Sequence, residues 1–108
     1  MRITREEILK LNSSLGGNLV NSNSLDYSIS RFNHEDNRFK TCAFIIRGIV
    51  VDHPFSDGNK RTAVYVCMHE LGDCGDEKLS KFIVKIAKEN ISNINKIEKM
   101  LRRCYQKN

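Results

Sequence analysis

Residues 53–61, His-Pro-Phe-Ser-Asp-Gly-Asn-Lys-Arg, hold most of the side chains in this sequence that could do chemistry. Histidine side chains titrate near neutral pH, so His53 can accept a proton from a hydroxyl nucleophile. Asp57 is a hard oxygen ligand of the kind that Mg²⁺ prefers beside phosphates. Arg61 can hold a phosphate through two parallel hydrogen bonds. The segment therefore predicts a site that holds a metal-bound phosphate next to a general base.

Three neighbouring residues favour an anion at the same place. Gly58 lets the backbone approach an anion closely, and Asn59 can supply a side-chain donor. The free N–H groups at the start of the following helix attract a phosphate. Lys60 and Arg61 would be mildly unfavourable at this positive helix end unless an anion lay between them. Each residue alone has a structural explanation, but their combination indicates a phosphate site.

The elements that must position this segment are helical, because apolar residues recur at helical spacing along most of the chain. Thr4 and Glu7 predict a capping box for a first helix that Gly16 ends. An Asn- and Ser-rich loop or short extended flap is expected at 18–24. Further helices are expected at 25–32, at 36–51, at 59–71, around Leu79, Phe82, Ile83 and Ile86, and after a cap at Ser92 with Ile94, Ile97, Leu101 and Cys104 inward. These patterns predict an all-α bundle of about six helices, with the 53–61 loop joining two central helices.

Length and composition bound the class of protein. The 108 residues form one domain, 1–108, with 40% hydrophobic and 29% charged residues, as in soluble globular proteins. No apolar run approaches the roughly 20 residues of a membrane helix. The N-terminus lacks the apolar segment of a signal peptide, so we expect a cytoplasmic protein. Its four cysteines are then expected to be small buried hydrophobes, since a zinc site of Cys67, His69 and Cys74 fits no common spacing.

Positive charge is concentrated in the C-terminal third. Residues 78–108 carry nine basic and two acidic residues, net +7, whereas residues 1–77 have a net charge of −2. Such a segment could attract nucleic acid or an acidic protein, although a solvated helix face is the simpler interpretation. No aromatic residues alternate with these lysines, so the pattern gives little support to nucleic-acid binding.

The loop resembles the signature of the Fic/Doc (Fido) family, His-x-Phe-x-Asp/Glu-Gly-Asn-Gly/Lys-Arg. The Lys-Arg-Thr-Ala run at 60–63 is especially similar to the Doc, or death-on-curing, branch. The resemblance implies the all-α Fido core and transfer of part of a nucleotide, ATP with Mg²⁺, to a protein hydroxyl. It implies the following roles: His53 as base, Asp57 as Mg²⁺ ligand, and Gly58, Asn59 and Arg61 as phosphate ligands, with Lys60 less well defined.

Departures from the signature bear on which reaction occurs. Members that transfer AMP usually have a second arginine where this sequence has Val64. An aliphatic residue there matches Doc, whose type member phosphorylates a threonine of elongation factor Tu. Gly58 instead follows the AMP-transferring pattern, since that type member has alanine. The resemblance thus favours a kinase-type toxin acting on a Ser or Thr hydroxyl of a translation factor, with protein adenylylation as the alternative.

Some family members carry an inhibitory helix with the motif Ser/Thr-x-x-x-Glu-Gly/Asn, and this sequence has no match to it. The nearest candidate ends in Glu89-Asn90, but position 85 is a lysine where the motif has Ser or Thr. Restraint by a separate antitoxin protein is therefore expected. The segment 16–25 corresponds to the flap that positions a target in such proteins. Two alternatives remain: a catalytically inactive helical interaction module, motivated by the basic C-terminal third, and a short Fido domain that acts inside a larger complex.

Overall fold

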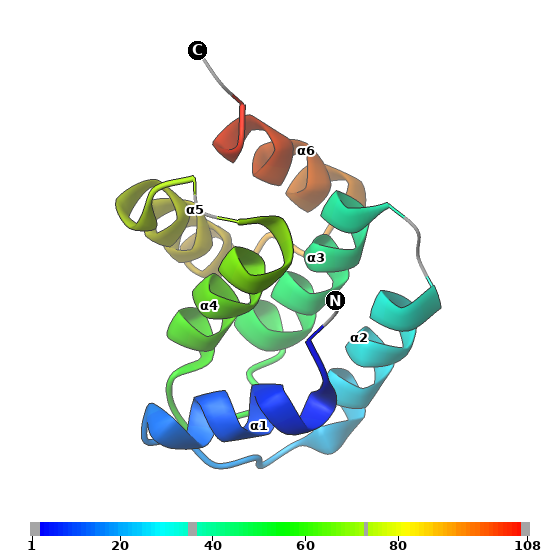
Figure 1. Ribbon diagram of the computed structural model, residues 1–108, viewed down its shortest axis with the longest axis vertical. Coiled ribbons are helices and arrows are strands. Elements are labelled where there is room, and N and C mark those ends of the chain that lie inside the picture. The colour runs from blue at the N-terminus through cyan, green and yellow to red at the C-terminus, as the bar shows by residue number, and fades with distance from the viewer. Residues whose placement is uncertain (1–2, 35–36, 73, 107–108) are drawn as a thin grey trace.

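The computed structural model describes residues 3–34, 37–72 and 74–106, and the named secondary-structure elements in these ranges are all helices. Figure 1 shows α3 in the middle of the molecule, with α1 across one end and α6 at the other. The helices are α1 Arg5–Ser14, α2 Ser22–His34, α3 Arg38–Ile46 with a π-helical turn Arg47–Val51 (η1), α4 Asn59–Leu71, α5 Asp76–Glu89 and α6 Ile94–Cys104. The predicted all-α bundle is confirmed.

Side-chain caps start several of these helices. The capping box predicted at the start of α1 is present: the Glu7 N–H donates to the Thr4 hydroxyl, and the Thr4 N–H donates to the Glu7 carboxylate at 2.9 Å. At α6 the prediction was wrong by one residue. Asn93, not Ser92, is the N-cap, and its side-chain oxygen accepts the Lys96 N–H at 3.0 Å. Asn and Ser are about equally good caps, so the sequence alone does not discriminate between adjacent candidates.

The loop was predicted to join two central helices, and α3, the helix before it, lies at the centre of the bundle. Residues 41–46 are all buried, and the helix packs against α2, α4 and α6. Phe55, from the loop that follows, is also part of this core. The expected helix 25–32 is longer than predicted, since α2 begins at Ser22 and takes up part of the Asn- and Ser-rich segment.

The expected helix 36–51 does not keep α-helical geometry to its end. Its last turn, η1, is π-helical, and the Asp52 N–H donates to the Arg47 carbonyl five residues back. Asp36 lies outside the described residues. The wide turn directly precedes the 53–61 loop, and π turns are frequent at functional sites.

Gly48 in η1 lets this turn approach α2 closely. A Cβ placed on Gly48 would lie 2.7 Å from the Ser28 Cβ and closer still to its hydroxyl. Ser28 is itself buried, so it has no free space to move into.

We therefore expect Gly48→Ala to lower the free energy of unfolding by about 2 kcal/mol through overpacking. Chemical denaturation of the variant and of the unmodified protein measures the difference. Adding Ser28→Gly to the variant should recover part of the loss, because it removes both atoms that the new methyl group meets. Equal stability of Gly48→Ala and the unmodified chain would contradict the close approach of α2 and η1.

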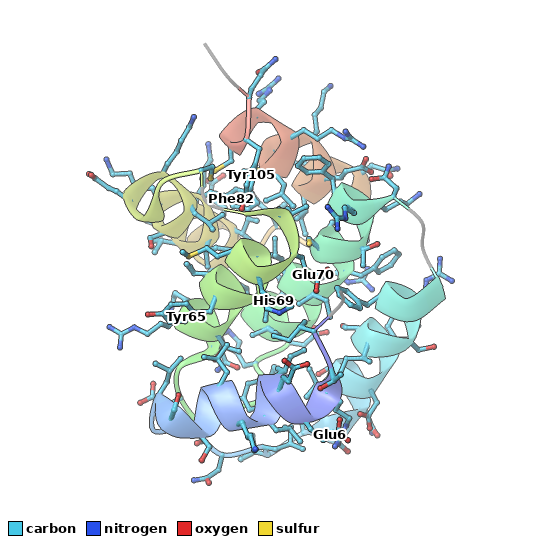
Figure 2. All side chains as sticks on the ribbon, in the orientation of Figure 1. Glu6, Tyr65, His69, Glu70, Phe82 and Tyr105 are labelled. Carbon is cyan, nitrogen blue, oxygen red and sulfur yellow. The ribbon has the colours of Figure 1, made fainter. Side chains whose placement is uncertain are left out.

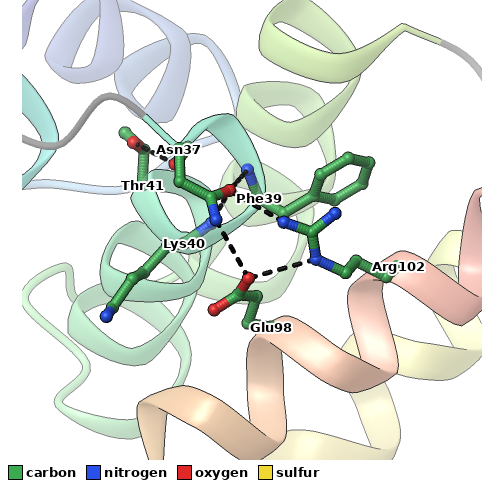
Figure 3. Close-up of polar contacts among 6 residues, drawn as sticks. All are labelled: Asn37, Phe39, Lys40, Thr41, Glu98 and Arg102. Atoms are coloured by element: carbon green, nitrogen blue, oxygen red, sulfur yellow. Dashed lines mark hydrogen bonds and ion pairs between the residues drawn. The ribbon is translucent and has the colours of Figure 1, made fainter.

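A polar cluster fastens the start of α3 to α6 (Figure 3). Asn37 caps α3 and its Nδ2 donates to Glu98 at 3.2 Å. Arg102 donates to both Glu98 and Asn37 at 3.1 Å, and its guanidinium lies 4.6 Å from the centre of the Phe39 ring. Arg102, one of the cations in the basic C-terminal third, is therefore engaged in holding the bundle together.

No helix within the described ranges has both the length and the apolar character needed to cross a membrane.

Candidate functional site

The 53–58 loop reaches α4 through two residues with left-handed backbone. His53 has φ +51°, and Gly58, the residue before α4, has φ +73°. A positive φ is unusual for a residue other than glycine, and it costs roughly 1–3 kcal/mol that the surroundings must offset. Such residues cluster at functional sites, and the His53 side chain is exposed to solvent.

Asn59 holds the loop in this shape. Its Oδ1 accepts the Phe55 N–H at 3.1 Å, and its Nδ2 donates to the Phe55 carbonyl at 2.9 Å. The Asn59 amide therefore forms two hydrogen bonds across the loop, whereas the sequence analysis predicted that it donates directly to an anion. Because Phe55 is buried in the core, these hydrogen bonds fix the loop to the bundle.

The segment before α2 lies alongside the same loop. Leu19 and Phe55 form an isolated antiparallel bridge, and the Ser56 N–H donates to the Asn18 carbonyl at 2.8 Å. The part of the chain predicted as a flap, 16–25, thus contains a short extended stretch that supports the loop, followed by the first turn of α2.

Asn12 in α1 forms hydrogen bonds that hold the loop in place, and the sequence analysis did not identify this role. Its Nδ2 donates to the Asp57 carbonyl at 2.8 Å and to the Thr62 hydroxyl at 3.1 Å. The side chain is buried, and Gly17 packs so closely that a Cβ there would clash with it. Ile8 in the same helix is buried, whereas Leu11 and the following Leu15 are only half-buried. The sequence did contain one signal of its burial: Asn12 lies four positions after Ile8, and residues at this spacing share one face of a helix.

The predicted site residues meet at one open cavity of about 420 Å³. It is lined by Leu15, His53, Ser56, Asp57, Gly58, Asn59, Lys60 and Arg61. The imidazole, the carboxylate and the guanidinium therefore share a space large enough for phosphate groups. The charged side chains on the wall are exposed, so they can reach a ligand without first breaking a buried ion pair.

The N-terminus of α4 opens into this cavity with its backbone donors available. Within the described residues, no side chain caps α4, whereas α1, α3 and α6 each have a side-chain cap. The first turn of α4 carries Lys60 and Arg61 and no acidic residue. Uncapped N–H groups, the helix dipole and two cations together favour an anion at this position.

Asp57 is the only carboxylate that lines the cavity, among the residues described. Its Oδ1 accepts the Gly58 N–H at 2.8 Å, which fixes the carboxylate and leaves its second oxygen for a ligand. Mg²⁺ characteristically binds one or two carboxylates and completes its shell with phosphate oxygens and water. The residues present therefore fit a Mg²⁺ ion that arrives with a nucleotide.

A second, more apolar cavity of about 270 Å³ adjoins the first and shares Lys60 and Arg61 with it. It lies between α4 and α5 and is lined further by Val64, Tyr65, Met68, Ser80, Ile83 and Val84. Tyr65 and Val84 keep 44% and 49% of their surface exposed, and Figure 2 shows Tyr65 projecting outward from α4. A polar cavity beside an apolar one is the combination that a nucleotide needs.

Three of the cysteines are buried as predicted, and Cys74 is half-buried. Nowhere in the described ranges do three or more metal-ligating His, Cys, Asp or Glu side chains gather. Cys67, His69 and Cys74 are thus not brought together as a zinc site.

Comparison with protein families matches residues 18–71 to the Fic/DOC family. The match contains the whole 53–61 loop, the α4 helix and the two helices before the loop. Searches of curated proteins and of solved structures each give no match.

Proposed function

Since this chain belongs to the Fic/DOC family, we propose that it transfers the terminal phosphate of Mg-ATP to a serine or threonine hydroxyl of a protein. The family in general consists of transferases that modify proteins with part of a nucleotide. The observation that carries the proposal is the single cavity at the uncapped end of α4, lined by His53, Asp57 and Arg61.

In the proposed reaction, the nucleotide phosphates occupy the cavity at the start of α4. The N–H groups of the first turn and the Arg61 guanidinium bind their oxygens. Asp57 would hold Mg²⁺, which neutralises phosphate charge when bound. His53 takes the proton of the target hydroxyl as its oxygen attacks the terminal phosphorus, and the bond from that phosphorus to the bridging oxygen of ADP breaks.

The environment of Val64 supports terminal-phosphate transfer over AMP transfer. Val64 lies one turn after Arg61, is buried, and lines the apolar cavity. A second guanidinium at this position would add another phosphate ligand, and its absence changes how a triphosphate is held. AMP transfer remains the second candidate, because Gly58 leaves the backbone approach to the phosphates as open as in AMP-transferring members.

Labelled ATP distinguishes the two reactions. The purified chain is incubated with a bacterial lysate and Mg-ATP labelled at either the α or the γ phosphate. Protein-bound label from the γ position alone is the expected result. Label from the α position would establish AMP transfer instead, and no label from either position would favour an inactive interaction module.

The apolar cavity would hold the nucleoside, with Tyr65 against the base. Loss of one base–aromatic contact is worth about 1–3 kcal/mol. We therefore expect Tyr65→Ala to raise KM for ATP about 10-fold with little change in kcat, as measured by steady-state kinetics. Tyr27→Ala is the matched control, since Tyr27 is similarly exposed but lies on α2. The same KM for Tyr65→Ala and Tyr27→Ala would show that the base does not bind against Tyr65.

The proposed biological role is that of a toxin held in check by an acidic antitoxin protein, with a translation factor such as elongation factor Tu as target. A shallow basic groove between α5 and α6 supports an acidic partner: Lys78, Lys81, Lys85 and Arg103 surround an apolar floor with Phe82 and Met100. Charge complementarity of this kind speeds association and weakens with salt. Sizing the chain with the product of a neighbouring gene, at low and high salt, tests the pairing.

A further inference from the structure

Two of the four thiols meet at the far end of α4 from the cavity. The sulfur atoms of Cys74 and Cys104 are 3.3 Å apart and are not bonded. Cys74 lies in the connection from α4 to α5, and Cys104 is the last residue of α6. A bonded pair would need the sulfurs to approach by only roughly 1.3 Å more, and a loop residue can supply that movement.

The backbone around the pair is already held in place. The Tyr105 hydroxyl donates to the Gly72 carbonyl at 2.7 Å, which joins the end of α6 to the end of α4. Its ring packs edge-on against Phe39, at 5.9 Å between ring centres, and Figure 2 shows Tyr105 at this junction. Closing the bond would therefore add a covalent link to an existing contact rather than bring distant segments together.

We propose that Cys74 and Cys104 form a redox-active pair that a peroxide oxidises to an intramolecular disulfide. The Cys74 sulfur attacks one oxygen of hydrogen peroxide, the O–O bond breaks, and a sulfenic acid and water are formed. The Cys104 sulfur then attacks the Cys74 sulfur and expels its oxygen as a second water molecule. Two thiols are oxidised, one peroxide is reduced, and both thiol protons leave in the water.

The order of these steps follows from access. Cys74 is half-buried, whereas Cys104 is buried. Burial and the neighbouring Cys74 thiol raise the pKa of Cys104 to about 12, so at neutral pH Cys104 carries its proton and reacts slowly with peroxide. Lys78 beside Cys104 acts in the opposite direction and favours the thiolate when it attacks. Cys67 is fully buried, and desolvation raises its pKa well above the usual range, which sets it apart as a bystander.

The test uses the full chain treated with hydrogen peroxide at a few equivalents. The expected product is a monomer lighter by two hydrogen atoms, with two titratable thiols instead of four under denaturing conditions, and with peptides containing residues 74 and 104 cross-linked. The melting temperature should rise by about 10 °C and return when a reductant is added, because the bond closes a loop of some thirty residues.

Matched variants locate the pair. Cys74→Ser and Cys104→Ala should each abolish the mass change and the shift in melting temperature, whereas Cys42→Ala should keep both. The proposal is overturned if peroxide yields only higher oxides or intermolecular dimers, if the cross-link involves Cys67, or if Cys74→Ser still loses two hydrogens. The first two of these outcomes are measured on the unmodified chain, so they would overturn the proposal even if a variant failed to fold.

Discussion

Replacing His53 by alanine is expected to lower kcat for protein phosphorylation about 100-fold or more, because the target hydroxyl then loses its general base. His53→Asn should lose as much activity. Asparagine tolerates the left-handed backbone observed at this position, so this second variant removes the base without adding strain. The rate of γ-phosphate incorporation into the protein target measures both.

The control is His69→Ala, which removes a partly exposed histidine on the same helix as Arg61 but outside both cavities. Its kcat should stay within about 2-fold of the unmodified value. If His53→Asn retains full activity while folding normally, His53 is not the base, and another group must accept the proton.

Arg61→Ala is expected to lower kcat/KM about 100- to 1,000-fold, because one preorganised cation at the transferring phosphate is lost. Arg61→Lys should recover only part of this, since an ammonium keeps the charge but not the two parallel hydrogen bonds. Steady-state kinetics with varied Mg-ATP separates the contributions to KM and to kcat.

Arg103→Ala serves as the comparison, because Arg103 is an exposed arginine on α6, away from the α4 cavity. Its kinetics should match those of the unmodified chain. Equal losses in Arg61→Ala and Arg103→Ala would mean that net charge, rather than a specific phosphate ligand, governs the rate.

Much of the fold could be predicted because glycines that interrupt the helical pattern coincide with helix ends. Gly58 and Gly72 flank α4, and its predicted bounds, 59–71, are those observed. The helix before the loop was likewise predicted to be central, and residues 41–46 of α3 are all buried. The start of α2 was missed because Asn and Ser suit loops and helix starts alike, and only packing decides between them.

The residues of the candidate site could be predicted where they lie in one continuous segment, and they were missed where the support comes from another part of the chain. His53 and residues 56–61 line the expected cavity. Asn12, 45 positions from the Asp57 carbonyl that it binds, could not be assigned to that contact without the fold. Asn59 is among the predicted site residues, but its hydrogen bonds to Phe55 depend on a loop shape that residue types and spacing do not specify.

The π turn at Arg47–Val51 amounts to one residue more than an α-helix of the same rise would need. Removing a single residue there would let the helix return to α-helical spacing with nearly the same rise and rotation over that turn. His53 would then keep its position at the start of α4. A one-residue deletion should accordingly be tolerated far better in this turn than within α3 or α4, where it would rotate all following residues by roughly 100° about the helix axis.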